Sequence, residues 1–139
     1  MNRLVKILIS VTLVVLGGMV YLLYRDRSLL MFSWFDAVGI GGVVDSMRVW
    51  AVSVDPYHWV RYNMPAGLWL FSYMFGIDAV WGDDNSGSGR LFVYALPALA
   101  LVSEFLQIAG LCPGVFDVLD VLSYLLAIVS FKIIKRYER

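Results

Sequence analysis

Two pairs of polar residues in the second half of the chain have a spacing that suits chemistry. Glu104 and Gln107 form one pair, and Asp117 and Asp120 form the other. Residues three positions apart share one face of a helix, so each pair presents its two side chains together. Converging carboxylates can act as a general base, bind a polar headgroup or hold a divalent cation. We predict that these four residues form one polar site.

Arg61 and Asn63 are the predicted complements of this acidic site, because they precede an apolar run that begins at the same level. Two structural interpretations stand beside the functional one. Acidic residues in the first turn of a helix also suit its macrodipole, which would explain the aspartate pair. The glutamate–glutamine pair could equally be a hydrogen-bonded contact that locks two helices together.

The sequence points to no metal, cofactor or known catalytic motif. No loop has the ligand spacing of a cation site, and a single histidine excludes a site built from several histidines. One cysteine excludes an internal disulfide. There is no nucleophile elbow, HExxH sequence, P-loop or CxxC pair. These residues leave open whether the chain is an enzyme, and they favour a non-enzymatic role.

The composition is that of a membrane protein. Of the 139 residues, 60% are hydrophobic and only 16% are charged, and the mean hydropathy is +0.76. A soluble chain of this length could not bury so much apolar surface. The net charge is zero, which gives no electrostatic attraction for a polyanion. We therefore expect neither a soluble enzyme nor a nucleic-acid binder.

Apolar runs long enough to span a bilayer must position the polar site. About 20 residues at 1.5 Å each match a hydrocarbon core of ~30 Å. Four such runs lie at about residues 4–24, 64–81, 91–110 and 118–134. A polar loop at 82–90 separates the second and third, and Pro113-Gly114 reverses the chain before the fourth. We predict an all-α, polytopic transmembrane helical bundle that forms a single membrane domain, 1–139.

The segment 29–54 allows two interpretations. It is apolar and aromatic, yet it contains Asp36, Asp45 and Arg48 and several glycines. Each charge at the bilayer centre costs ~2.5–3.5 kcal/mol on insertion scales, which argues against a simple span. Two short amphipathic helices in the membrane interface, hinged at the glycines, fit better. A fifth span with its charges facing the protein interior is the alternative.

The distribution of positive charge predicts the orientation. With four spans, one side of the membrane carries more Lys and Arg residues, namely Arg3, Lys6, Arg90, Lys132, Lys135, Arg136 and Arg139. The other side carries Arg25, Arg27, Arg48 and Arg61. The positive-inside rule then places both termini in the cytoplasm of a multi-pass protein in the cell membrane. Glu104 lies about 20 Å along its helix, which puts the polar site on the extracytoplasmic side.

Three short segments resemble the VanZ-like family of integral membrane proteins. Ser103–Gln107 contains Glu-x-x-Gln in a late span, and Gly114–Asp120 ends in Asp-x-x-Asp at the start of the last span. Asn63–Gly67 resembles the earlier Pro-x-Gly element of that family. The resemblance covers roughly residues 60–130. It departs at Tyr124, where the family often has Asn, and in the turn after Gln107, which lacks the Arg often found there.

The resemblance implies an envelope protein of the glycopeptide (teicoplanin) resistance type, in which an arginine such as Arg61 or Arg48 would replace the missing one. Three functions compete. The first is binding of a lipid-linked or cell-wall headgroup, or of an antibiotic, at the polar site. The second is a structural or assembly subunit of a membrane complex. The third is an intramembrane enzyme that processes a lipid, with Glu104 or Asp120 as base. The expected partners are membrane lipid, a lipid-linked cell-wall precursor or glycopeptide, and further membrane subunits.

Overall fold

A computed structural model describes residues 1–81 and 87–138, and these residues form seven helices and no strand. The predicted all-α class is confirmed. The helices are α1 (Arg3–Tyr24), α2 (Leu30–Ala37), α3 (Gly41–Val52), α4 (His58–Tyr62), α5 (Met64–Trp81), α6 (Gly87–Ile108) and α7 (Val118–Tyr137).

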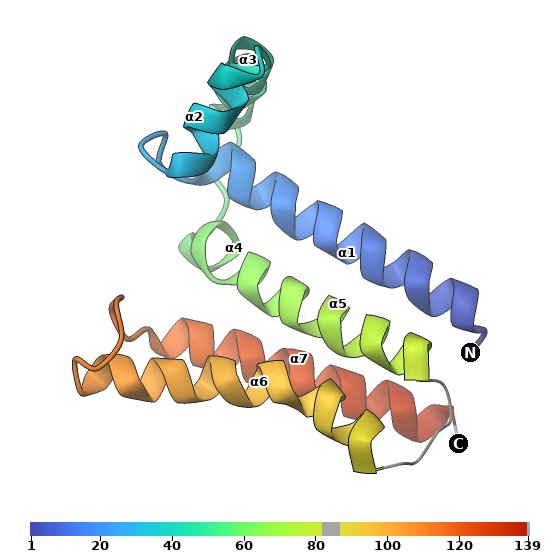
Figure 1. Ribbon diagram of the computed structural model, residues 1–139. Helices are drawn as coiled ribbons and strands as arrows, with labels where there is room; N and C mark the ends of the chain where they lie inside the picture. Colours follow the sequence, from blue (N-terminus) through green and yellow to red (C-terminus); the bar gives the residue numbers. More distant parts are fainter. Residues whose placement is uncertain (82–86, 139) are drawn as a thin grey trace.

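The four long helices, α1, α5, α6 and α7, lie beside one another and alternate in direction (Figure 1). Helix α5 is central, with α1 on one side and α6 and α7 on the other. Both termini lie at one end of the bundle, which we call the terminal end. Helix α4 and the connection between α6 and α7 lie at the opposite, distal end. The N-terminal amine is 3.5 Å from Glu138 Oε1, so the two termini are neighbours.

The helix bounds follow largely from local chemistry. Asn2 and Asp117 cap α1 and α7 with side-chain oxygens that accept backbone N–H groups. Helix α5 has the predicted bounds, but α6 begins at Gly87 rather than at Leu91. Residues 87–90, which were predicted to belong to the polar loop, are helical. Each residue added to an existing helix gains a backbone hydrogen bond, and this gain offsets the low helix propensity of glycine. The remainder of that loop, 82–86, lies outside the described residues.

Small residues bring α5 close to its neighbours. A Cβ atom at Gly17 of α1 would lie 2.7 Å from Trp69 Nε1 and 3.3 Å from the Pro65 carbonyl oxygen. A Cβ atom at Gly67 would lie 3.1 Å from the Ser123 carbonyl oxygen of α7. Contacts through small residues are typical of helices that pack inside a bilayer. The apolar core lies nearer the terminal end and consists of Met74, Phe75, Val93 and Phe131.

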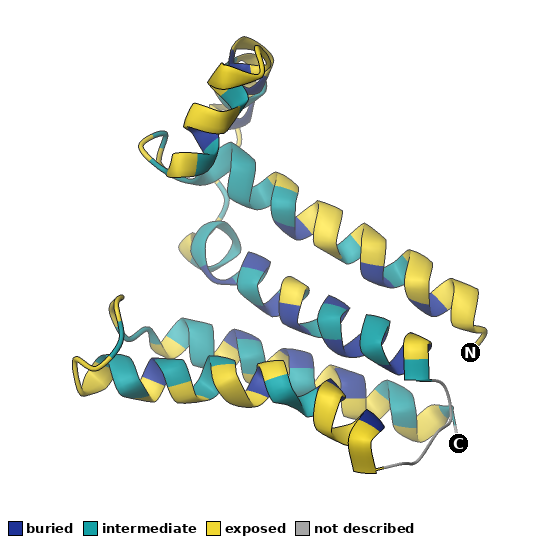
Figure 2. Cartoon of the chain, in the orientation of Figure 1, coloured by how far each residue is buried: buried dark blue, intermediate teal, exposed yellow. Residues whose placement is uncertain are grey.

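The outer surface of the bundle is strongly apolar. Figure 2 shows exposed residues along the outward face of α1. Leu8 and Val11 of this helix are among the exposed residues. Leu99 of α6 and Leu126 of α7 are also exposed. Soluble monomers rarely expose apolar patches beyond a few hundred Å². Helices α1 and α6 are long and apolar enough to cross a membrane.

The segment 29–54 forms two short helices, α2 and α3, beside the distal end of α1 (Figure 1). The chain turns between them at Gly39, whose φ of +80° suits glycine. Arg27 forms ion pairs with Asp36 (2.7 Å) and Asp45 (2.9 Å). Arg48 donates to two carbonyl oxygens at the end of α1. Asp36, Asp45 and Arg48, the charges that argued against a simple span, are therefore all paired locally. The location of the segment 29–54 in the membrane interface stays a prediction.

Candidate functional site

Asn63 joins the two aspartates at the distal end of the bundle. It follows α4 and directly precedes α5, and only 1% of its surface is exposed. Its Nδ2 donates to Asp117 Oδ2 (2.7 Å) and to Asp120 Oδ1 (2.9 Å). Because both partners are acceptors, they fix which side of the amide faces α7. The predicted pairing of Asn63 with the acids is present.

Glu104 reaches the same place from α6. It is 4% exposed, and its Oε2 accepts a hydrogen bond from the backbone N–H of Asp117 (3.3 Å). Asp117 in turn caps α7 by accepting from Leu119 N (2.8 Å). The helix-start role considered for the aspartate pair is therefore real for Asp117. The other carboxylate oxygen of Asp117, Oδ2, accepts the hydrogen bond from Asn63 at the same time.

Gln107 completes the cluster one turn further along α6. With its amide oriented to satisfy its neighbours, it donates to Glu104 Oε2 (3.3 Å) and to the Val115 carbonyl oxygen (3.1 Å). Gly114 makes room for it: a Cβ atom there would lie 2.6 Å from the end of the Gln107 side-chain amide, and φ is +122°. We call the group of Asn63, Glu104, Gln107, Asp117 and Asp120 the acid–amide cluster.

Arg61 does not complement these acids, contrary to the prediction. Its guanidinium forms an ion pair with Asp55 and lies 5.4 Å from the centre of the Tyr24 ring. The short helix α4 sets this direction, since Arg61 lies two residues before Asn63 and leaves the helix on another side. The expected contact fails because local helical geometry separates the two side chains.

Arg25 is a cation near the cluster that sequence reasoning missed. Its guanidinium interacts electrostatically with Asp120. It donates to the Tyr62 carbonyl oxygen (3.0 Å) and lies against the rings of Tyr21 and Tyr62. Its place directly after the first apolar run was the available signal.

Beside Arg25, hydrogen bonds from Ser28 lower the pKa of Asp26, which keeps that exposed carboxylate ionised.

The acid–amide cluster has more acceptors than donors. Each ionised carboxylate offers about four lone-pair positions, and three carboxylates meet here. The donors that the structure places among them are the two amides and two backbone N–H groups. Within the part of the chain that the structure describes, the buried Asn63 Oδ1 accepts no hydrogen bond. A matching ligand must therefore bring hydroxyl, amide N–H or ammonium groups.

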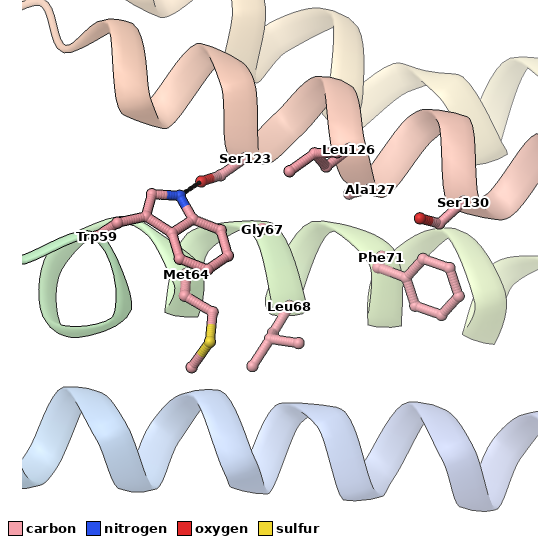
Figure 3. Close-up of a pocket in the computed structure, with 9 residues that line it drawn as sticks. All are labelled: Trp59, Met64, Gly67, Leu68, Phe71, Ser123, Leu126, Ala127 and Ser130. Carbon is pink, nitrogen blue, oxygen red and sulfur yellow. Dashed lines mark hydrogen bonds between the residues drawn. The ribbon is translucent and has the colours of Figure 1, made fainter. Parts of the chain in front are cut away.

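An open groove lies along the seam between α5 and α7 (Figure 3). Its lining begins at Met64 and Ser123, within one turn of Asn63 and Asp120. Its volume is about 170 Å³. The indole of Trp59 lies at the end nearest the cluster and donates to Ser123 Oγ (2.8 Å). The walls are mainly apolar and include Leu68, Phe71 and Leu126. No feature of the sequence indicated this groove, because it depends on how two helices pack.

A second set of charges, which we call the terminal charge network, lies at the other end of the bundle. Lys6 Nζ is 2.7 Å from Asp78 Oδ2 and 2.6 Å from Glu138 Oε2. Lys135 Nζ is 2.7 Å from the other Asp78 oxygen. The side chains of Lys6 and Asp78 are each 7% exposed. Sequence reasoning overlooked Asp78, although it is the only acidic residue in the 64–81 run.

The structure thus brings together Asn63, Glu104, Gln107, Asp117 and Asp120, and it places Arg61 outside their contacts. Among the described residues, no set of three or more His, Cys, Asp or Glu side chains is arranged to hold a metal ion. No protein family model matches the chain, and neither does any curated protein or solved structure.

Proposed function

We propose that the chain is a four-span integral membrane protein of the VanZ-like type. Two of its four long helices are long and apolar enough to cross a membrane, and α5 and α7 lie alongside them. The apolar outer surface supports this arrangement, since hydrocarbon would cover it. Both termini lie at one end, as an even number of spans requires. In this proposal the terminal end faces the cytoplasm and the distal end faces outward.

Its function, in our proposal, is to bind a lipid-linked or cell-wall headgroup, or a glycopeptide, at the acid–amide cluster. One observation carries this: Asn63 is buried between two carboxylates while its own oxygen has no partner among the described residues. An unpaired buried acceptor costs about 1–3 kcal/mol, which a donor-bearing ligand would recover. Sugar hydroxyls, peptide N–H groups and amines all supply such donors.

The VanZ-like assignment draws support from where the motif residues lie. The segments that carry the resemblance are far apart in sequence, yet Asn63, Glu104 and Asp120 contribute to one cluster. The arginine that the family often has in the turn would have a substitute in Arg25 rather than in Arg61 or Arg48. This replacement keeps one cation beside the acids.

Glu104→Gln tests the binding function against a purely structural role. The substitution keeps shape and an oxygen that can accept from Asp117 N, while removing the charge. We expect thermal stability in detergent to change by less than about 1 kcal/mol, and protection of expressing cells against teicoplanin to be lost. Asp55→Asn removes an exposed acid at the same end and serves as the matched control. Joint loss of stability and protection would instead show that the cluster only locks helices together.

The orientation can be tested by labelling single cysteines in a Cys112→Ser background. A cysteine at Val115, an 88% exposed position between α6 and α7, should react with an impermeant maleimide in intact cells. A cysteine at Asn2 should react only after the membrane is permeabilised. External labelling at Asn2 would reject the four-span arrangement and favour five spans.

A further inference from the structure

The acid–amide cluster and the groove lie on one continuous seam between α5 and α7. On α5, Gly67 follows Asn63 by four residues and Phe71 follows by eight, so all three share one side of the helix. On α7, Ser123 follows Asp120 by three residues, and Ser130 lies two turns further. At 1.5 Å per residue the groove extends ~12 Å from the cluster into the bundle.

The groove is mainly apolar, whereas the neighbouring acid–amide cluster is polar. The hydrogen-bonding groups of Trp59 and Ser123 are already paired within the protein. Ser123 Oγ accepts from the Trp59 indole and donates to the Leu119 carbonyl oxygen (2.8 Å). Beyond Trp59 the lining turns to Leu68, Phe71 and Leu126, as Figure 3 shows. An occupant must therefore be polar near Asn63 and apolar from there onward.

The size of the groove selects among apolar occupants. A helix from a second protein is about 10–12 Å across with its side chains and cannot enter about 170 Å³. A single hydrocarbon chain is narrow and flexible enough to lie along the seam. At this depth, in the proposed orientation, hydrocarbon chains surround the protein.

We infer that the α5–α7 groove holds one hydrocarbon chain of an amphiphile whose polar group occupies the acid–amide cluster. The inference rests on the proposed function and narrows its ligand to a lipid with a donor-bearing headgroup. Trp59 lies where chain and headgroup meet, and its indole separates the two environments. Gly67 keeps α5 close to Ser123, which forms the floor of the groove.

Photolabelling of the full chain in lipid nanodiscs tests the inference. The probe is phosphatidylethanolamine with a diazirine in one acyl chain, because its ammonium group supplies the N–H donors that the cluster lacks. Labelling of residues 64–71 and 123–130 should saturate at a low mole fraction of probe. Lipid that merely surrounds the bundle would label all outward faces in proportion to its concentration.

Ser130→Phe should fill the inner part of the groove and weaken the saturable labelling by about tenfold or more. Leu126→Trp provides a second test one turn away on the same face of α7, and both positions are exposed enough to accept a larger side chain. Val129→Phe, at an exposed neighbouring position outside the groove, is the matched control and should leave labelling unchanged. Equal labelling in all three variants, or labelling that never saturates, would overturn the inference.

The two proposals fail in different ways. If Glu104→Gln abolishes protection while Ser130→Phe leaves labelling unchanged, the polar site stands and the chain-binding groove is rejected. If Ser130→Phe removes saturable labelling while Glu104→Gln leaves protection intact, the groove binds a chain and the proposed headgroup function is wrong.

Discussion

Asn63 controls how two carboxylates share a small buried volume. An amide can donate to both Asp117 and Asp120 at once, whereas an apolar side chain would leave the two acids facing each other without a donor. Burial makes the loss of such a contact expensive, since water cannot replace the missing donor. Position 63 therefore requires an amide group as well as a side chain of this size.

Asn63→Asp should destabilise the protein by roughly 1–3 kcal/mol, because it replaces a shared donor with a further carboxylate. Adding Asp120→Asn should recover part of this loss, since the amide introduced at position 120 can donate to the carboxylate introduced at position 63. Unfolding in mixed micelles with increasing SDS measures both. Purely additive losses would show that Asn63 and Asp120 are not energetically coupled.

At the scale of helices, apolar length predicted most of what the structure contains. The run 64–81 became α5 with no change of bounds. In the proposed membrane setting, a helix is the form in which such a segment satisfies its own backbone groups. The positions of Arg61 and Asp78 could not be predicted in the same way. The direction of Arg61 depends on a single turn of helix, and the partners of Asp78 come from α1 and α7.

Two adjacent glycines in α1 offer a matched test of helix packing. Gly17→Ala should loosen α1 from α5, because its Cβ atom would collide with Trp69 and approach the Pro65 backbone. Gly18→Ala meets no atom within 4 Å and should stabilise α1 by roughly 0.5–1 kcal/mol through helix propensity. Opposite signs in an unfolding titration are expected. Equal effects would contradict the close contact at Gly17.

For the molecule as a whole, the terminal charge network fastens three helices together. Asp78 of α5 contacts Lys6 of α1 and Lys135 of α7, with one carboxylate oxygen for each. A buried ion pair contributes little net stability when intact, yet removing one partner leaves a buried charge without compensation. The arrangement therefore penalises any packing that separates α1 or α7 from α5.

Asp78→Asn should destabilise the bundle by about 1–3 kcal/mol, since two ammonium groups lose a charged partner although Lys6 keeps Glu138. Lys6→Met combined with Asp78→Asn should restore part of the stability by removing one of those charges. Asp36→Asn, which breaks a more exposed ion pair with Arg27, is the control and should have an effect of about 0–1 kcal/mol. A small effect at Asp78 would show that water reaches the network.

The contact between α1 and α5 joins two charge centres at opposite ends of the bundle. Arg25, just after α1, supplies the cation near Asp120, and Lys6 near the start of α1 supplies the cation on Asp78. A tilt of α1 away from α5 would uncover acids at both ends of the bundle at once. The packing of α1 against α5 therefore links the charge balance at the two ends of the bundle.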